Sequence, residues 1–169
     1  MVKDLEALGA DIITIHASGD EDMLKAAVSA RRTSKLLAIT ILTSMTEVQV
    51  RHTYDRSKNA AVAQMAALAY ETGCDGTVSS PVDLTHLKTN PEVGNGKMIR
   101  CTPGIRWRDE SVANDDQARV MEPKDAVVAG AHWLVIGRPI IRARDPVAAA
   151  ERAEAEAAEG WAAAHSYMY

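Results

Sequence analysis

A glycine and an arginine end an apolar run near the C-terminus, and together they could hold an anion. Residues 133–136 are Trp-Leu-Val-Ile, and Gly137 and Arg138 follow directly. A short apolar run bounded by glycine is typical of a buried parallel strand, whose carboxyl end is where α/β folds place ligand sites. The glycine lets a phosphate approach backbone N–H groups, and a guanidinium can donate to two phosphate oxygens at once. We expect an anion site here; a strand end followed by a surface arginine is the alternative.

Five strand–helix units precede or contain this stretch. Apolar runs predict strands at 11–17, 36–42, 76–79, 97–101 and 133–136, and helical patterns predict helices near 2–8, 20–28, 59–72, 81–87, 123–129 and from 145 onward. Strands that alternate with helices predict right-handed βαβ units around a parallel sheet. Periodicity leaves two α/β folds open, a doubly wound sheet or part of a (β/α)8 TIM-type barrel, which would need three more units.

Two connections are much longer than the ~2–6 residues usual in such units, namely 43–58 and 106–122. Both follow the carboxyl ends of predicted strands. They are candidate lids over a site, and surface insertions without function are the alternative.

The composition favours one soluble domain. Of 169 residues, 47% are hydrophobic and 25% charged, and the net charge of −4 argues against a nucleic-acid or anionic-membrane partner. No run approaches the ~18 apolar residues of a membrane span and the N-terminus is too charged for a signal peptide, so we expect a cytoplasmic protein. Cys74 and Cys101 lack the spacing of metal ligands and are expected to be reduced core thiols, and His16 is expected to be structural. We predict no metal site.

Six short segments resemble the orotidine 5'-phosphate decarboxylase family in order and spacing. They are His16-Ala17-Ser18-Gly19, Leu42-Thr43-Ser44-Met45, Asp75-Gly76-Thr77-Val78, Thr102-Pro103-Gly104-Ile105-Arg106, Asp116-Gln117 and Ile136-Gly137-Arg138-Pro139-Ile140. The match covers about residues 2–152, and Asp20 stands where many members carry a second glycine. The resemblance implies an incomplete (β/α)8 barrel in which this chain supplies strands four to eight.

The family's motifs also imply a substrate site. Arg106, Gln117, Gly137 and Arg138 would hold the substrate phosphate, and Thr43 would contact the substrate near its pyrimidine end. The implied reaction converts orotidine 5'-phosphate to uridine 5'-phosphate and CO2 in pyrimidine biosynthesis, without a cofactor. Without the resemblance, Arg106 and Gln117 would be taken as solvated loop residues and Thr43 as a helix cap.

The family's catalytic lysine lies between aspartates in a motif D-x-K-x-x-D, which is absent from this sequence, so we assign no catalytic residue. In the family the motif lies on the third strand, just before the helix in which this chain begins. The chain also opens inside a helical pattern with no preceding cap. We therefore expect that Met1 is an internal methionine of a longer reading frame, or that the chain is a fragment, and that it is inactive alone.

The expected ligand is orotidine or uridine 5'-phosphate, and the expected protein partner is a second copy in a homodimer or a complementing N-terminal segment. Two alternatives remain: a catalytically incomplete phosphate-binding fragment, and another sugar-phosphate decarboxylase or synthase of the same superfamily.

We expect residues 1–169 to form one partial barrel domain. Residues 153–169 lie beyond the resemblance as a helical tail, with a helix to about Ala158 and a break at Gly160. Because five strands cannot close a barrel, the strands containing Ile12 and Val135 should present unpaired edges and an exposed apolar face.

Overall fold

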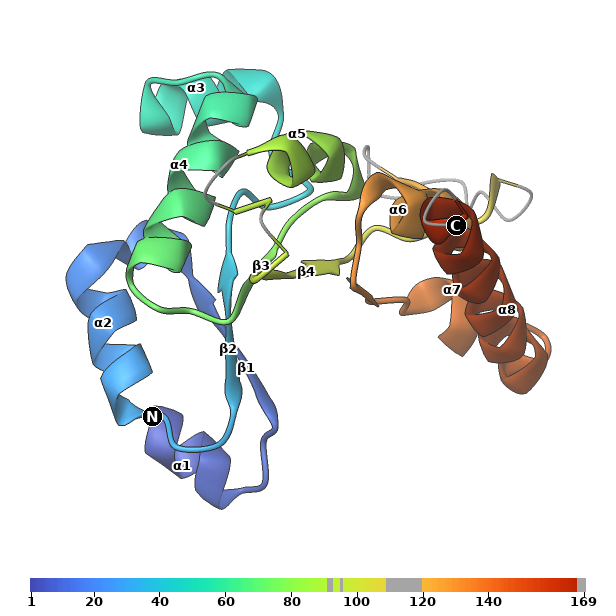
Figure 1. The fold of residues 1–169 in the computed structure, drawn as a ribbon, viewed down its shortest axis with the longest axis horizontal. Helices are drawn as coiled ribbons and strands as arrows, with labels where there is room; N and C mark the ends of the chain where they lie inside the picture. Colours follow the sequence, from blue (N-terminus) through green and yellow to red (C-terminus); the bar gives the residue numbers. More distant parts are fainter. Residues whose placement is uncertain (91–92, 95, 109–119, 167–169) are drawn as a thin grey trace.

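Five parallel strands form one sheet in a computed structural model of the chain (Figure 1). The structure describes residues 1–90, 93–94, 96–108 and 120–166. The strands are β1 (Ile12–His16), β2 (Lys35–Ile39), β3 (Gly76–Val78), β4 (Ile99–Thr102) and β5 (Trp133–Leu134). Each strand pairs with the next along the chain, in the order β1-β2-β3-β4-β5. The predicted parallel βαβ arrangement is confirmed.

The helices connect these strands and continue beyond the last one. They are α1 (Val2–Ala7), α2 (Asp20–Ala30), α3 (Glu47–Tyr54), α4 (Lys58–Glu71), α5 (Leu84–Thr89), α6 (Pro123–Ala129), α7 (Arg138–Ile141) and α8 (Pro146–His165), with short 3-10 turns η1 (Ala17–Gly19) and η2 (Pro81–Asp83). Helix α6 starts and ends where proline and glycine signals predict, since Pro123 occupies its first turn and Gly130 caps it with a φ of 115°.

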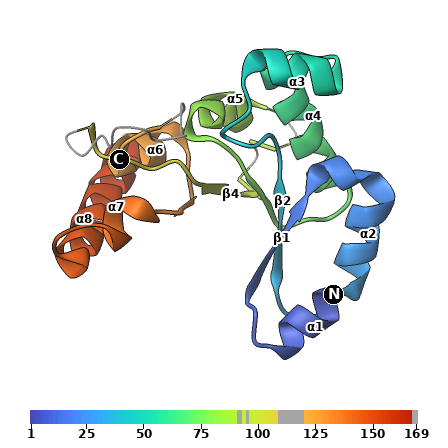
Figure 2. The same cartoon turned by 180° about the vertical axis from the view of Figure 1, so that it is seen from behind.

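The two faces of the sheet differ in how well they are covered. Helices α2 and α4 lie along one side of β1 and β2 in both views (Figures 1 and 2). On that side Ile13 and Leu36 are buried with Ala27 of α2, in one apolar cluster. Side chains alternate between faces along a strand. Ile12 points to the other face and is 49% exposed, and Val135, just after β5, is 50% exposed. Exposed apolar side chains are therefore present at both outer strands, as expected, although Leu37 on the same face as Ile12 is buried.

One expected loop is largely helical. The sequence predicts a long connection without a helix at residues 43–58, but α3 occupies Glu47–Tyr54. Thr46 begins this helix, because its side chain accepts a hydrogen bond from the Gln49 backbone while the Gln49 side chain accepts one from the Thr46 backbone. The helix has little apolar periodicity, since Val50 is its buried residue and Val48 is 77% exposed. The sequence signal for this helix is therefore the capping pair and not an apolar stripe.

The predicted break at Gly160 is wrong. Helix α8 runs through it to His165, and Gly160 is buried against α6. A Cβ at this position would lie 2.6 Å from the carbonyl oxygen of Lys124 and 3.0 Å from Cβ of Val127. The glycine therefore lets the two helices approach closely, and this packing outweighs its weak helix propensity.

In the part of the chain that the structure describes, no helix combines the length and the apolar character needed to cross a bilayer.

Candidate functional site

Arg106, Gly137 and Arg138 follow the carboxyl ends of two neighbouring strands. Thr102 of β4 is aligned with Leu134 of β5, and the Val135 backbone N–H donates to the Thr102 carbonyl at 2.9 Å. Arg106 comes four residues after the end of β4, and Gly137 comes three after the end of β5. The structure thus brings these segments to one edge of the sheet, as the sequence predicts.

Arg106 lies near the start of the long connection between β4 and α6, where the two ends of that connection meet. Its backbone N–H donates to the Met121 carbonyl at 3.0 Å, and the Met121 N–H donates to the Gly104 carbonyl at 3.3 Å. Ile105 and Met121 form a parallel bridge. Gly104 has a φ of 81°, which favours glycine at this turn. The Arg106 guanidinium is half-buried and its Nη1 donates to the Ile105 carbonyl at 2.6 Å, so both ends of the connection are held together beside this side chain.

Gly137 is the residue that precedes α7. Its carbonyl accepts hydrogen bonds from the N–H groups of Ile140 and Ile141, both at 3.0 Å. Among the described residues other than its two chain neighbours, none has a heavy atom within 4 Å of the position that a Cβ on Gly137 would occupy. Arg138, the next residue, is half-buried. This end of β5 has open space beside a glycine and a neighbouring guanidinium, which is what an anion site requires.

Thr43 lies in a turn after β2, two strands away from β4. Neighbouring strands are about 4.8 Å apart, so the end of β2, four residues before Thr43, lies about 10 Å from the end of β4 across the sheet. Thr43 does not cap α3, because Thr46 does. The buried Lys58 donates from Nζ to the Met45 carbonyl and thereby ties this turn to α4. Gln117 lies outside the described residues.

Sequence reasoning missed a set of buried hydroxyl groups near the same edge. Oγ1 of Thr40 lies 3.1 Å from Oγ of Ser79 and 3.2 Å from the Val78 carbonyl oxygen. The Ser80 and Thr102 hydroxyl oxygens are buried and have no hydrogen-bond partner in the described part of the chain. The only sequence signal is a threonine or serine at or near the carboxyl end of four of the five apolar runs, since the run at 133–136 is followed by Gly137.

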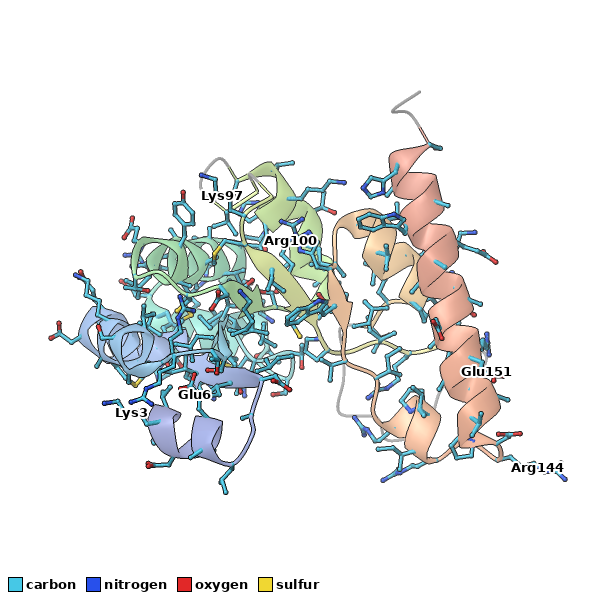
Figure 3. All side chains as sticks on the ribbon, turned by 60° about the horizontal axis from the view of Figure 1, so that its bottom comes forward. Lys3, Glu6, Lys97, Arg100, Arg144 and Glu151 are labelled. Carbon is cyan, nitrogen blue, oxygen red and sulfur yellow. The ribbon has the colours of Figure 1, made fainter. Side chains whose placement is uncertain are left out.

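The opposite, amino-terminal edge of the sheet carries carboxylates that hold the fold together. Glu6 of α1 accepts hydrogen bonds from the N–H groups of Arg32, Thr33 and Ser34 at 2.9, 3.0 and 2.9 Å. These bonds to the charged form, led by the one from Arg32, lower its pKa from 4.5 to about 2. Figure 3 shows Glu6 on α1, far from Arg144 at the start of α8.

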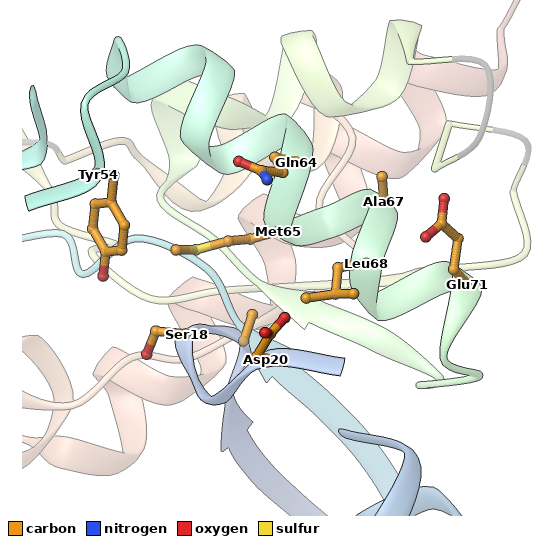
Figure 4. A pocket seen from close by; sticks show the side chains of 9 residues that line it. Ser18, Asp20, Tyr54, Gln64, Met65, Ala67, Leu68 and Glu71 are labelled. Carbon is orange, nitrogen blue, oxygen red and sulfur yellow. The ribbon is translucent and has the colours of Figure 1, made fainter. Parts of the chain in front are cut away.

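A separate cavity of 430 Å³ lies between η1, the start of α2 and helices α3 and α4 (Figure 4). Its polar lining includes Ser18, Asp20, Tyr54, Gln64 and Glu71, and Met65 and Leu68 form an apolar side. Its lining contains none of the residues expected to bind substrate. Asp20 has a φ of 68° and a ψ of 179°, a conformation that suits glycine.

Neither cysteine forms a disulfide, and both are buried. Burial raises the pKa of both thiols. Among the described residues, no group of three or more His, Cys, Asp or Glu side chains is placed to hold a metal ion.

Consecutive parallel strands joined by helices, with polar residues at their carboxyl ends, define an α/β protein of the (β/α)-barrel class. The sequence model of the orotidine 5'-phosphate decarboxylase / HUMPS family matches residues 1–153. The chain belongs to this family.

Individual relatives agree with the family match. The chain is 37% identical over 153 residues to an orotidine 5'-phosphate decarboxylase of Staphylococcus saprophyticus, covering 87% of this chain and 64% of that protein. A Streptococcus pneumoniae protein of the same name is 39% identical over 165 residues, covering 95% of this chain and 68% of that protein. The crystal structure of orotidine 5'-phosphate decarboxylase from Lactobacillus acidophilus superposes with a TM-score of 0.75 at 31% identity, covering 92% of this chain and 67% of that one. The chain thus spans about two thirds of the length of these relatives.

Proposed function

We propose that this chain is the phosphate-holding part of an orotidine 5'-phosphate decarboxylase and binds the 5'-phosphate of a pyrimidine nucleotide. The observation that carries the proposal is the position of Arg106 and of Gly137–Arg138 at the ends of adjacent strands β4 and β5. Two guanidinium groups can share the charge of a phosphate dianion, and the open space at Gly137 admits its oxygens to the backbone.

The distance across the sheet supports a nucleotide rather than free phosphate. The end of β2, which leads into the Thr43 turn, lies two strand spacings, or roughly 10 Å, from the end of β4. An extended nucleotide bound by its phosphate between β4 and β5 would bring its base toward the Thr43 turn, which Lys58 and α3 hold in place. Gln117, on the connection that begins at Arg106, completes the proposed phosphate contacts.

Phosphate binding serves a decarboxylase because it fixes a part of the substrate remote from the reacting carbon. Binding energy gained there can be used to orient the base and to exclude water where charge develops. The lysine motif that the family uses to protonate that carbon is absent from this sequence. We therefore propose that turnover requires a segment carrying that motif, which would cover the exposed apolar face that includes Ile12 and Val135.

A calorimetric titration with uridine 5'-phosphate tests the binding site. Arg106→Ala and Arg138→Ala should each weaken binding about tenfold to a hundredfold, since each removes a hydrogen bond between charged groups. Arg144→Ala is the matched control, because this exposed arginine lies just before the start of α8, away from the sheet edge (Figure 3). Equal affinity in all four proteins would contradict the proposed site.

A decarboxylation assay with orotidine 5'-phosphate tests the activity, first with the chain alone and then with an added polypeptide that supplies three βα units ending in the lysine motif. Turnover only with the added polypeptide is the expected result. Turnover by the chain alone would refute the claim that the proton donor lies outside it.

Nucleotide binding without turnover in either arm would favour an inert phosphate-binding fragment. Preference for a plain sugar phosphate, such as ribulose 5-phosphate, over uridine 5'-phosphate would favour the sugar-phosphate branch of the family. Sedimentation velocity on the same samples would show whether the chain forms the proposed homodimer.

A further inference from the structure

We propose that Glu156 of helix α8 positions the phosphate-binding Arg106 by holding its neighbour, Trp107. This inference rests on the proposed function, because it assumes that Arg106 contacts a phosphate. Glu156 lies beyond residues 1–153, which the family model matches. The C-terminal helix would thus contribute to the site without touching the ligand.

The contact is direct and well formed. The indole Nε1 of Trp107 donates to both carboxylate oxygens of Glu156, each at 2.9 Å. Arg152, one turn earlier on α8, donates from Nε to the same carboxylate at 2.9 Å, and its Cζ lies 4.5 Å from the centre of the Trp107 ring. The three side chains form one unit, in which the arginine orients the carboxylate and stacks on the ring that the carboxylate binds.

Trp107 is only 2% exposed, although it lies in a polar connection. A buried indole N–H needs an acceptor, and leaving it without one costs the desolvation of that group. Glu156 is the acceptor, and it comes from an element 49 residues away in the sequence. Without it, the ring would be driven toward water, and the chain around residue 107 would move with it.

A displacement of Trp107 would also shift Arg106, because Arg106 is the preceding residue in the same part of the connection. Its backbone is fixed to Met121, and its guanidinium contacts the carbonyl of Ile105. On the other side of Trp107, the Arg108 N–H donates to Glu122 at 3.2 Å, and the Arg108 guanidinium lies 3.6 Å from Asp125. Trp107 is therefore a buried residue between Arg106 and Arg108, and both of these arginines contact residues at the other end of the connection.

Helix α8 is held in place by contacts of its own, so Glu156 can fix the position of Trp107. It packs closely on α6 at Gly160, one turn beyond Glu156, and Lys124 of α6 pairs with Glu159 at 3.0 Å. These contacts anchor the helix independently of Trp107.

Because these contacts do not involve Trp107, a substitution in one of them can serve as the matched control. Glu159→Ala removes a carboxylate from the same helix and weakens its docking on α6, but does not touch Trp107. Glu156→Ala removes the acceptor of the indole, whereas Glu156→Gln keeps an acceptor oxygen of the same reach. Adding Trp107→Phe to Glu156→Ala removes the stranded donor and leaves an aromatic ring to fill the site.

The test measures the affinity of the full chain for uridine 5'-phosphate, with the indole N–H signal of Trp107 followed by 15N NMR. We expect Glu156→Ala to weaken binding about fivefold to tenfold and to lose the protected indole signal. Glu156→Gln and Glu159→Ala should bind within about twofold of the wild type, and the double variant Glu156→Ala/Trp107→Phe should recover most of the loss.

The outcomes separate the two proposals. If the wild-type chain binds the nucleotide and Glu156→Ala binds equally well, or if Glu159→Ala loses as much as Glu156→Ala, the positioning role of Glu156 is refuted and the phosphate site stands. If the wild-type chain does not bind the nucleotide, the proposed function fails and this inference fails with it.

Discussion

Replacing Gly160 with alanine tests whether α6 and α8 approach each other as closely as the structure indicates. The added Cβ would lie 2.6 Å from the Lys124 carbonyl oxygen, whereas ordinary contact begins at 3.4 Å, so the helices would have to separate locally by about 0.8 Å. The obstacle is backbone, which cannot rotate away as a side chain could. Overpacking of this kind costs about 2–3 kcal/mol.

Helix propensity acts in the opposite direction. Alanine in place of glycine inside a helix gains about 1 kcal/mol, so the net effect of Gly160→Ala should be a loss of about 1–2 kcal/mol in the free energy of unfolding. Urea titrations followed by circular dichroism would measure it. Ala162→Gly, at an exposed position of the same helix, is the control and should cost about 1 kcal/mol from propensity alone. A Gly160→Ala variant that is more stable than the wild type by that amount would refute the close approach.

Three further predictions concern other parts of the structure. Asp20→Gly should raise the free energy of unfolding by about 1 kcal/mol, because the φ of 68° and ψ of 179° at Asp20 suit glycine; Asp55→Gly, at a left-handed position that aspartate tolerates, should change it less. Glu6 stabilises the fold fully above its ordinary pKa of 4.5, and this contribution is lost as the pH falls toward about 2. Denaturant titrations across that range should therefore show a weaker pH dependence for Glu6→Gln. Cys74 and Cys101 are buried with raised thiol pKa values, so iodoacetamide at pH 8 should modify them slowly until the chain is unfolded.

Each of these measurements has a clear contrary result. Equal gains at Asp20 and Asp55 would mean that backbone conformation does not explain the effect. An unchanged pH profile in Glu6→Gln would mean that its hydrogen bonds do not persist in solution. Rapid modification of both thiols in the folded chain would contradict their burial.

Local signals in the sequence predict most of the sheet, because parallel strands in this chain are apolar runs bounded by turns. They predict α6 as well, through Pro123 and Gly130. They fail at α3, whose Val48 and Val50 alternate as in a strand, and whose start depends on a capping pair. They also fail at α7, a four-residue helix that is too short to show periodicity.

The candidate site divides in the same way. The segments carrying Arg106 and Gly137 are recognisable because motif and strand end coincide. The contact between Trp107 and Glu156 is not, because it joins residues 49 positions apart and depends on how α8 packs on α6. Gly160 also depends on this packing. A glycine in a helical pattern predicts a break, and the reason that α8 continues is visible only once the backbone of α6 is known to lie against Gly160.

The consecutive pairing of the strands has a consequence for how the sheet assembles. Because every strand adds to the one made just before it, the sheet can grow in the order of synthesis, and β5 joins last. This last strand has two residues and is held by one neighbour among the described strands. Its amide protons should exchange with solvent before those of β2 and β3, which are paired on both sides. The outer strand β5, after whose carboxyl end the phosphate would bind, then opens before these inner strands, and a bound nucleotide would slow exchange in β5 more than in the rest of the sheet.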